Sequence, residues 1–74
     1  MKNSNLKVAV IGLGNIGKVV ASNLVKGNRD VILADIIPVK AQDLAQQLGP
    51  HAKASEIGEA IQTADIVVLA IYFD

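Results

Sequence analysis

The chain has 74 residues, no cysteine, and seven basic residues balanced by seven acidic ones. This length allows one domain at most, and the lack of cysteine excludes a disulfide framework, a thiolate nucleophile and a cysteine metal site. The charges form no basic stripe, and the longest apolar run is shorter than the roughly 18 residues that suggest a membrane span. We therefore expect neither nucleic acid nor a membrane as partner, and a cytoplasmic location by default.

The first predicted strand, an apolar run over residues 6–11, leads directly into a helical pattern over residues 15–26. A G-x-G-x-x-G motif at such a strand-to-helix turn is a specific signal for dinucleotide binding, although the motif alone is weak. We expect the first glycine to make the tight turn, the second to admit a pyrophosphate, and the third to let the helix pack closely on the strand. A tight turn without a ligand is the alternative. The motif consists of Gly12, Leu13, Gly14, Asn15, Ile16 and Gly17.

A second strand is predicted over residues 31–34, followed by a helix that begins at Pro38 and stops at Gly49. Proline suits the first helical position because its fixed φ is helical and its missing N–H is not needed there. Glycine followed by proline is a common helix stop. The expected apolar faces are Ile16, Val19, Val20 and Leu24 in the first helix and Ala41, Leu44, Ala45 and Leu48 in the second.

The last predicted elements are a short strand over residues 51–54, a helix with Ser55 as its N-cap, and a strand that begins at Ile66. That final strand is so apolar that we expect it to lie centrally in the sheet. The third helix repeats the i, i+3, i+4, i+7 spacing of apolar residues. Its expected apolar face consists of Ile57, Ala60, Ile61 and Ala64.

The alternation β-α-β-α-β-α-β predicts an α/β fold with a parallel sheet and right-handed crossovers. It corresponds to the first half of a Rossmann-type domain with strand order 3-2-1-4. We expect residues 1–74 to form one nucleotide-binding domain that is truncated after the fourth strand. The outer edge of that strand would then be open, and a homo-oligomer is one way to cover it.

Strand order places the ligand crevice beyond the carboxyl ends of the first, second and fourth strands. Asp35 ends the second strand, where a carboxylate can accept hydrogen bonds from ribose hydroxyls and repel a 2′-phosphate. NAD(H) is therefore favoured over NADP(H), and a role in capping the next helix is the alternative for this residue. The other residues expected at the crevice are Ile36 at the adenosine end and Ala70, Ile71 and Tyr72 towards the nicotinamide ribose.

Three stretches, residues 8–17, 44–49 and 64–71, resemble the N-terminal domain of the coenzyme F420-dependent NADP reductase family. The superfamily includes relatives of pyrroline-5-carboxylate reductase, and the glycine motif also resembles that of 3-hydroxyisobutyrate dehydrogenase-type enzymes. The resemblance covers nearly the whole chain. It implies hydride transfer between a nicotinamide and a second substrate bound against this domain. Family members that bind NADP often carry a Ser-Arg pair where this chain has Asp35 and Ile36.

These observations predict the dinucleotide-binding domain of an NAD(P)-dependent oxidoreductase that acts on a small molecule. A non-enzymatic NAD(H)-sensing regulatory domain and an inert fragment are the alternatives. The sequence indicates neither the substrate nor a catalytic residue, and it leaves open whether the chain alone is an enzyme. His51, the only histidine, is expected in a solvated loop away from the crevice, and no cluster suggests a metal site.

Overall fold

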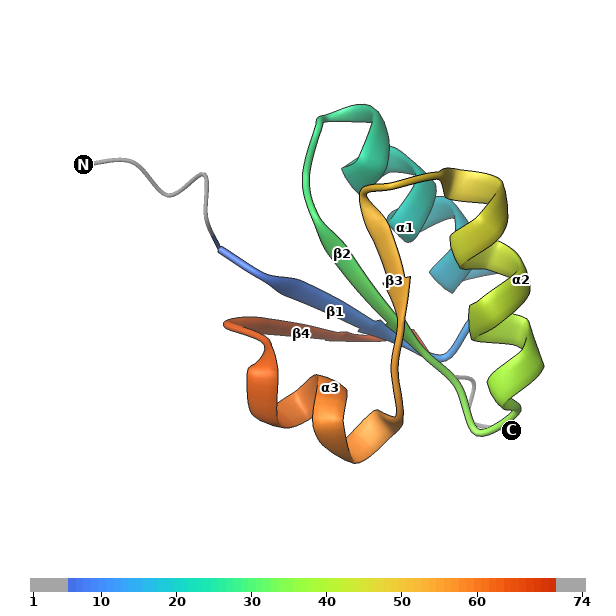
Figure 1. Ribbon diagram of the computed structural model, residues 1–74, viewed down its shortest axis with the longest axis vertical. Coiled ribbons are helices and arrows are strands. Elements are labelled where there is room, and N and C mark those ends of the chain that lie inside the picture. Colours follow the sequence, from blue (N-terminus) through green and yellow to red (C-terminus); the bar gives the residue numbers. More distant parts are fainter. Residues whose placement is uncertain (1–5, 71–74) are drawn as a thin grey trace.

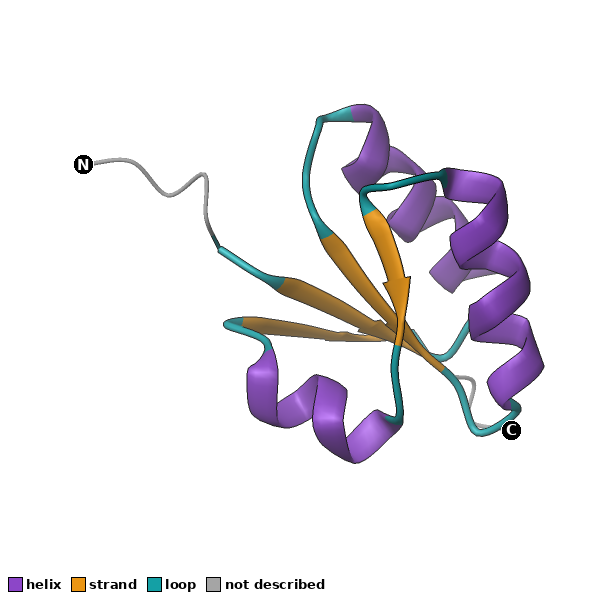
Figure 2. Cartoon of the chain, viewed as in Figure 1, coloured by secondary structure: helices purple, strands orange, loops and turns teal. Residues whose placement is uncertain are grey.

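Four parallel strands and three helices alternate along residues 6–70, the part of the chain that the computed structural model describes. Figures 1 and 2 show this alternation, which confirms the predicted order of elements. The strand order β3-β2-β1-β4 is also the predicted one. The elements are β1 (Val8–Ile11), α1 (Asn15–Lys26), β2 (Val31–Ala34), α2 (Pro38–Leu48), β3 (Ala52–Ala54), α3 (Ile57–Thr63) and β4 (Ile66–Leu69).

β1 lies inside the sheet and pairs with β2 on one side and with β4 on the other. Its four residues are all buried, as expected for a parallel strand that is covered on both faces. β4 is the edge strand next to β1 among the described residues, as the predicted strand order requires, and it is not the central strand that its apolar sequence suggested. With no neighbour beyond it, Ile66, Val67 and Leu69 remain exposed despite their apolar side chains.

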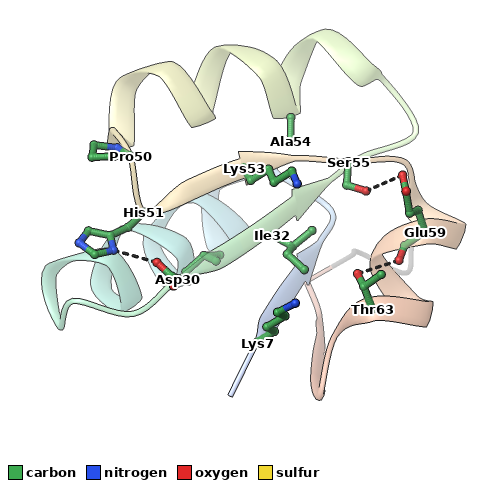
Figure 3. A pocket seen from close by; sticks show the side chains of 11 residues that line it. Lys7, Asp30, Ile32, Pro50, His51, Lys53, Ala54, Ser55, Glu59 and Thr63 are labelled. Atoms are coloured by element: carbon green, nitrogen blue, oxygen red, sulfur yellow. Dashed lines mark hydrogen bonds and ion pairs between the residues drawn. The ribbon is translucent and has the colours of Figure 1, made fainter. Parts of the chain in front are cut away.

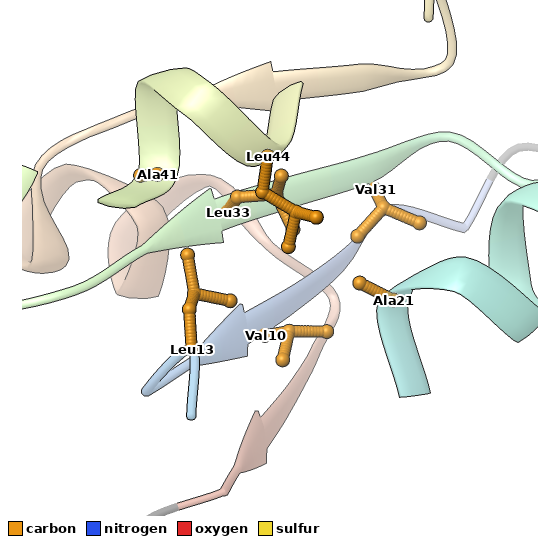
Figure 4. Packing of buried hydrophobic residues seen from close by; sticks show 7 residues of the cluster. All are labelled: Val10, Leu13, Ala21, Val31, Leu33, Ala41 and Leu44. Atoms are coloured by element: carbon orange, nitrogen blue, oxygen red, sulfur yellow. The ribbon is translucent and has the colours of Figure 1, made fainter. Parts of the chain in front are cut away.

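Helices cover both faces of the sheet, with α1 and α2 on one face and α3 on the other (Figure 1). Successive side chains of a strand point to opposite faces, so each face has its own core. Figure 4 shows the core under α1 and α2, which contains Val10, Leu13, Ala21, Val31, Leu33, Ala41 and Leu44. The core under α3 is smaller and consists of Ala9, Ile11, Ala34 and Ala60.

The predicted apolar face of α1 is confirmed in part, because Val20 and Leu24 pack against the core while Ile16 and Val19 do not. Ile16 and Val19 are 56% and 59% exposed, whereas Gly17 and Ala21 are buried. Small residues at this i, i+4 pair let the helix axis approach the sheet, and that close approach decides which face turns inwards. In α3, Ile61 is likewise exposed and Ala60 is buried. The predicted face of α2 is confirmed by its buried residues, Ala41 and Leu44.

The helix ends agree with the sequence prediction at α2 and differ at α3. Pro38 occupies the first turn of α2, and Gly49 caps its C-terminus with φ of 92°. The N-cap of α3 is Glu56, not Ser55. The hydroxyl of Ser55 instead donates to the Glu56 carbonyl at 3.3 Å and to the Glu59 carboxylate at 3.4 Å. Among residues 6–70, no helix has the length and apolar character needed to cross a bilayer.

Candidate functional site

The glycine turn between β1 and α1 depends on two glycines that lie against each other. Gly12 has φ of 94°, a left-handed value that disfavours residues with a side chain. Its amide donates to the Ala34 carbonyl at 2.9 Å, which holds the turn against the end of β2. A Cβ at Gly17 would collide with the Gly12 carbonyl oxygen, so α1 can start here only with glycine at that position. The structural roles predicted for the first and third glycines are therefore confirmed.

The N-terminus of α1 presents a row of free amides. The first helical hydrogen bond runs from the Lys18 amide to the Gly14 carbonyl at 3.0 Å. The amides of residues 14–17 have no acceptor within the described part of the chain, and the first turn contains no acidic side chain. Unpaired N–H groups and the positive end of the helix dipole attract anions. The turn therefore fits a pyrophosphate group, which would find donors there and no side chain at Gly14 in its way.

Asp35 follows β2 and faces the glycine turn. One carboxylate oxygen accepts a hydrogen bond from the Leu13 amide at 2.7 Å, and the other accepts one from the Ile37 amide at 2.8 Å. Burial raises the pKa of this carboxyl, but the two amides and the nearby charge of Lys40 outweigh burial, so the net pKa is lowered. Asp35 is therefore an anion at neutral pH.

A cleft of about 320 Å³ lies beyond the carboxyl ends of β1, β2 and β4. The strands are in register there, because Ile11 is level with both Ala34 and Leu69. As predicted from the strand order, the glycine turn, the end of β2 and Ala70 meet at this cleft. Ile71 and Tyr72 lie outside the described residues. The lining residues are Ile11, Gly12, Leu13, Gly14, Asp35, Ile36, Ile37, Lys40, Ile57 and Ala70.

Four of these lining residues were not predicted from the sequence. Ile11 precedes the glycine turn, and Ile37 and Lys40 follow Asp35. Their closeness in the sequence to predicted site residues could therefore have indicated them. Ile57 comes from α3 on the other face of the sheet, and no local pattern brings it to the site. Asn15, Ile16 and Gly17 belong to the site through their backbone amides and do not line the cleft with side chains.

A larger cleft, of about 660 Å³, lies on the α3 face of the sheet (Figure 3). Lys7, His51, Lys53 and Glu59 are among its lining residues, and His51 Nδ1 lies 2.9 Å from the carboxylate of Asp30. Size does not make it the better site, because none of its lining residues belongs to the glycine turn, where the free helix amides lie. His51 is partly exposed and away from the glycine turn, as the sequence predicted.

A profile of the family described as NADP oxidoreductase, coenzyme F420-dependent, matches residues 7–74. The chain belongs to this family. Membership in the F420-dependent NADP oxidoreductase family agrees with the geometry, in which a G-x-G-x-x-G turn opens a helix at the carboxyl edge of a parallel sheet. The family resemblance seen in the sequence is confirmed.

Individual relatives are also oxidoreductases. Glutamyl-tRNA reductase from Methanobrevibacter smithii is 40% identical over 68 residues, which are 89% of this chain and 17% of that protein. The solved glutamyl-tRNA reductase from Methanopyrus kandleri is 31% identical with a TM-score of 0.76, over 95% of this chain and 18% of that one. Quinate dehydrogenase from Corynebacterium glutamicum, solved in complex with NAD, is 29% identical with a TM-score of 0.77, over 93% of this chain and 28% of that one.

The chain thus spans about one sixth of the length of the curated relative that it matches. The family and the fold together show a Rossmann-type half-domain that binds a nicotinamide dinucleotide. The family is one of oxidoreductases. The sensing domain, which was the alternative function, finds no support among these relatives.

Proposed function

We propose that this chain holds NAD(H), in preference to NADP(H), in the cleft beside the glycine turn. The free amides of residues 14–17 bind the pyrophosphate, and Asp35 accepts hydrogen bonds from the adenosine ribose hydroxyls. Ile36, which is 84% exposed, and Ile57 cover the adenosine end, while Ala70, Ile71 and Tyr72 flank the nicotinamide ribose. The observation that carries this proposal is the Asp35 carboxylate, fixed 2.7 Å from the Leu13 amide inside the glycine turn.

The preference for NAD(H) follows from charge. The lowered pKa keeps Asp35 ionised, so a 2′-phosphate at the ribose would stand next to a fixed anion. Lys40 lines the same cleft, but its positive charge already acts on Asp35. It would have to neutralise both the Asp35 carboxylate and the 2′-phosphate. The family description names NADP, so the cofactor preference of this chain would depart from that description through the residues at the end of β2.

The bound nicotinamide supplies the hydride chemistry, and the residues of this chain position the cofactor. We further propose that residues 1–74 are the dinucleotide-binding domain of a cytoplasmic oxidoreductase whose small-molecule substrate binds against this domain. A homo-oligomer that covers the edge of β4 is part of the same proposal. Relatives that are several times longer than the chain support a larger parent protein.

Calorimetric titration of the chain with NADH and with NADPH tests the cofactor proposal. We expect NADH to bind at least about tenfold more tightly, which corresponds to about 1.4 kcal/mol. The double variant Asp35→Ser with Ile36→Arg should reverse the preference, because it removes the anion and adds a guanidinium that can pair with the 2′-phosphate. Asp43→Ser with Val39→Arg is the matched control, since it makes the same two charge changes on the exposed surface of α2 outside the cleft.

Tighter binding of NADPH by the unmodified chain would overturn the preference for NAD(H). Equal changes in this double variant and in Asp43→Ser with Val39→Arg would show that Asp35 acts only through the net charge of the domain. Absence of binding by either cofactor would overturn the proposed function of the isolated chain.

A further inference from the structure

We propose that Asp35 is also a positioning residue that holds the glycine turn in its binding conformation before any cofactor arrives. This inference deepens the proposed function and rests on it for the cofactor's place in the cleft. It arises from the two hydrogen bonds of the carboxylate, because they join segments on either side of the cleft. One bond reaches Leu13 in the glycine turn, 22 positions away in the sequence, and the other reaches Ile37 just before α2.

The bond to Leu13 fixes the middle of the turn. Leu13 lies between Gly12, whose φ is left-handed, and Gly14, the N-cap of α1. The Gly14 side chain is a single hydrogen, and no side-chain hydrogen bond caps α1. Within the described residues, the carboxylate of Asp35 is therefore the polar side chain that restrains this turn. Movement of Leu13 would also move the first free amides of α1.

The bond to Ile37 fixes the carboxylate itself. Ile37 is the N-cap of α2, and its amide donates to the Asp35 oxygen that Leu13 does not use. The carboxylate is thereby held from both sides, and each oxygen keeps a further lone pair for a ribose hydroxyl. Asparagine cannot replace it, because its single carbonyl oxygen can reach one of the two amides while its NH₂ group faces the other donor.

Positioning and direct charge repulsion predict opposite effects on a bound anion. If Asp35 acted only as a nearby charge, its removal would strengthen the binding of inorganic pyrophosphate at the turn. If it positions the turn, Asp35→Asn should weaken pyrophosphate binding severalfold, although the variant has one negative charge fewer. Asp43→Asn is the control, since it makes the same charge change on α2 at a residue outside the cleft.

Amide NMR of the cofactor-free chain gives a readout that is independent of cofactor binding. In the unmodified protein, the amide protons of Leu13 and Ile37 should shift together in an acid titration with one common midpoint, that of Asp35. Lys40 lines the same cleft and its charge lowers the pKa of this carboxyl, so Lys40→Met should raise that midpoint for both amides. In Asp35→Ala, which removes both acceptor oxygens, hydrogen exchange at Leu13 and Ile37 should be about tenfold faster or more.

Each result decides the inference separately from the proposed function. Separate midpoints for Leu13 and Ile37, or no titration of either amide, would overturn the positioning role even if Asp35→Asn failed to fold. Tighter pyrophosphate binding by Asp35→Asn would also overturn it. A shared midpoint together with weaker pyrophosphate binding supports it, whichever of NADH and NADPH the chain prefers.

Discussion

The α-carbon of Gly17 lies so close to the carbonyl oxygen of Gly12 that no side chain fits between the start of α1 and the end of β1. The obstacle is backbone, which cannot rotate away as the end of a long side chain can. Gly17 also lies next to Ala70, since a Cβ built there would be 3.5 Å from the Ala70 Cβ. One glycine thus sets the spacing of the glycine turn, the first helix and the segment after β4.

Gly17→Ala should destabilise the fold by about 1–3 kcal/mol or more, because α1 must shift away from β1 to make room. This cost exceeds the gain of about 1 kcal/mol that alanine brings to a helix interior. Gly58→Ala is the matched control in α3, where a Cβ meets no atom within 4 Å. It should stabilise the protein by roughly 0.4–1 kcal/mol. Urea denaturation measures the change in unfolding free energy of each variant. If both variants were stabilised, or both destabilised, the packing explanation would be contradicted.

The contribution of Asp35 to stability should depend on pH. Its pKa is lowered in the folded protein, so the folded state releases the proton more readily than the unfolded chain does. The carboxylate therefore stabilises the fold above the pH at which an unfolded aspartate titrates, about 4, and this contribution is lost as the pH falls through the folded pKa. The difference in unfolding free energy between the unmodified protein and Asp35→Asn should be constant near neutrality and shrink in acid. A difference that stays the same from neutral to acidic pH would show that the two hydrogen bonds do not depend on the charge.

The edge of β4 should promote self-association. Leu69 is 65% exposed, and β4 has β1 as its single partner in residues 6–70. An apolar edge strand can pair with another chain, and lysine on such a strand opposes pairing. Leu69→Lys should therefore raise the dissociation constant of the self-associated form by about tenfold or more in sedimentation experiments. Val39→Lys, on the exposed side of α2, is the control and should leave it unchanged. A chain that stays monomeric at high concentration would contradict this prediction.

The sequence predicted the topology because its signals are local. Alternating strand and helix patterns leave few arrangements, and Pro38 and Gly49 mark the ends of α2 through their own backbone preferences. The same holds for the meeting of the glycine turn with Asp35, which follows from the strand order and the level ends of β1 and β2. These predictions needed no knowledge of side-chain packing.

Packing decided what the sequence did not predict. Ile16 and Val19 have the helical spacing of a buried face, but the close approach at Gly17 and Ala21 turns them outwards. β4 is apolar enough for the centre of a sheet, and its exposure depends on which strands surround it. The hydrogen bond between Asp35 and Leu13 joins residues 22 positions apart, so no periodic pattern indicated it.

The position of β1 between β2 and β4 has a consequence for how the protein forms during translation. Val8 is level with Ile66, so β1 obtains its second neighbour only after β4, 58 positions later in the sequence, has been made. Until then one side of β1 offers unpaired backbone groups to any passing polypeptide. Folding of this sheet therefore cannot be completed strand by strand along the chain, because the pairing of its inner strand waits for β4.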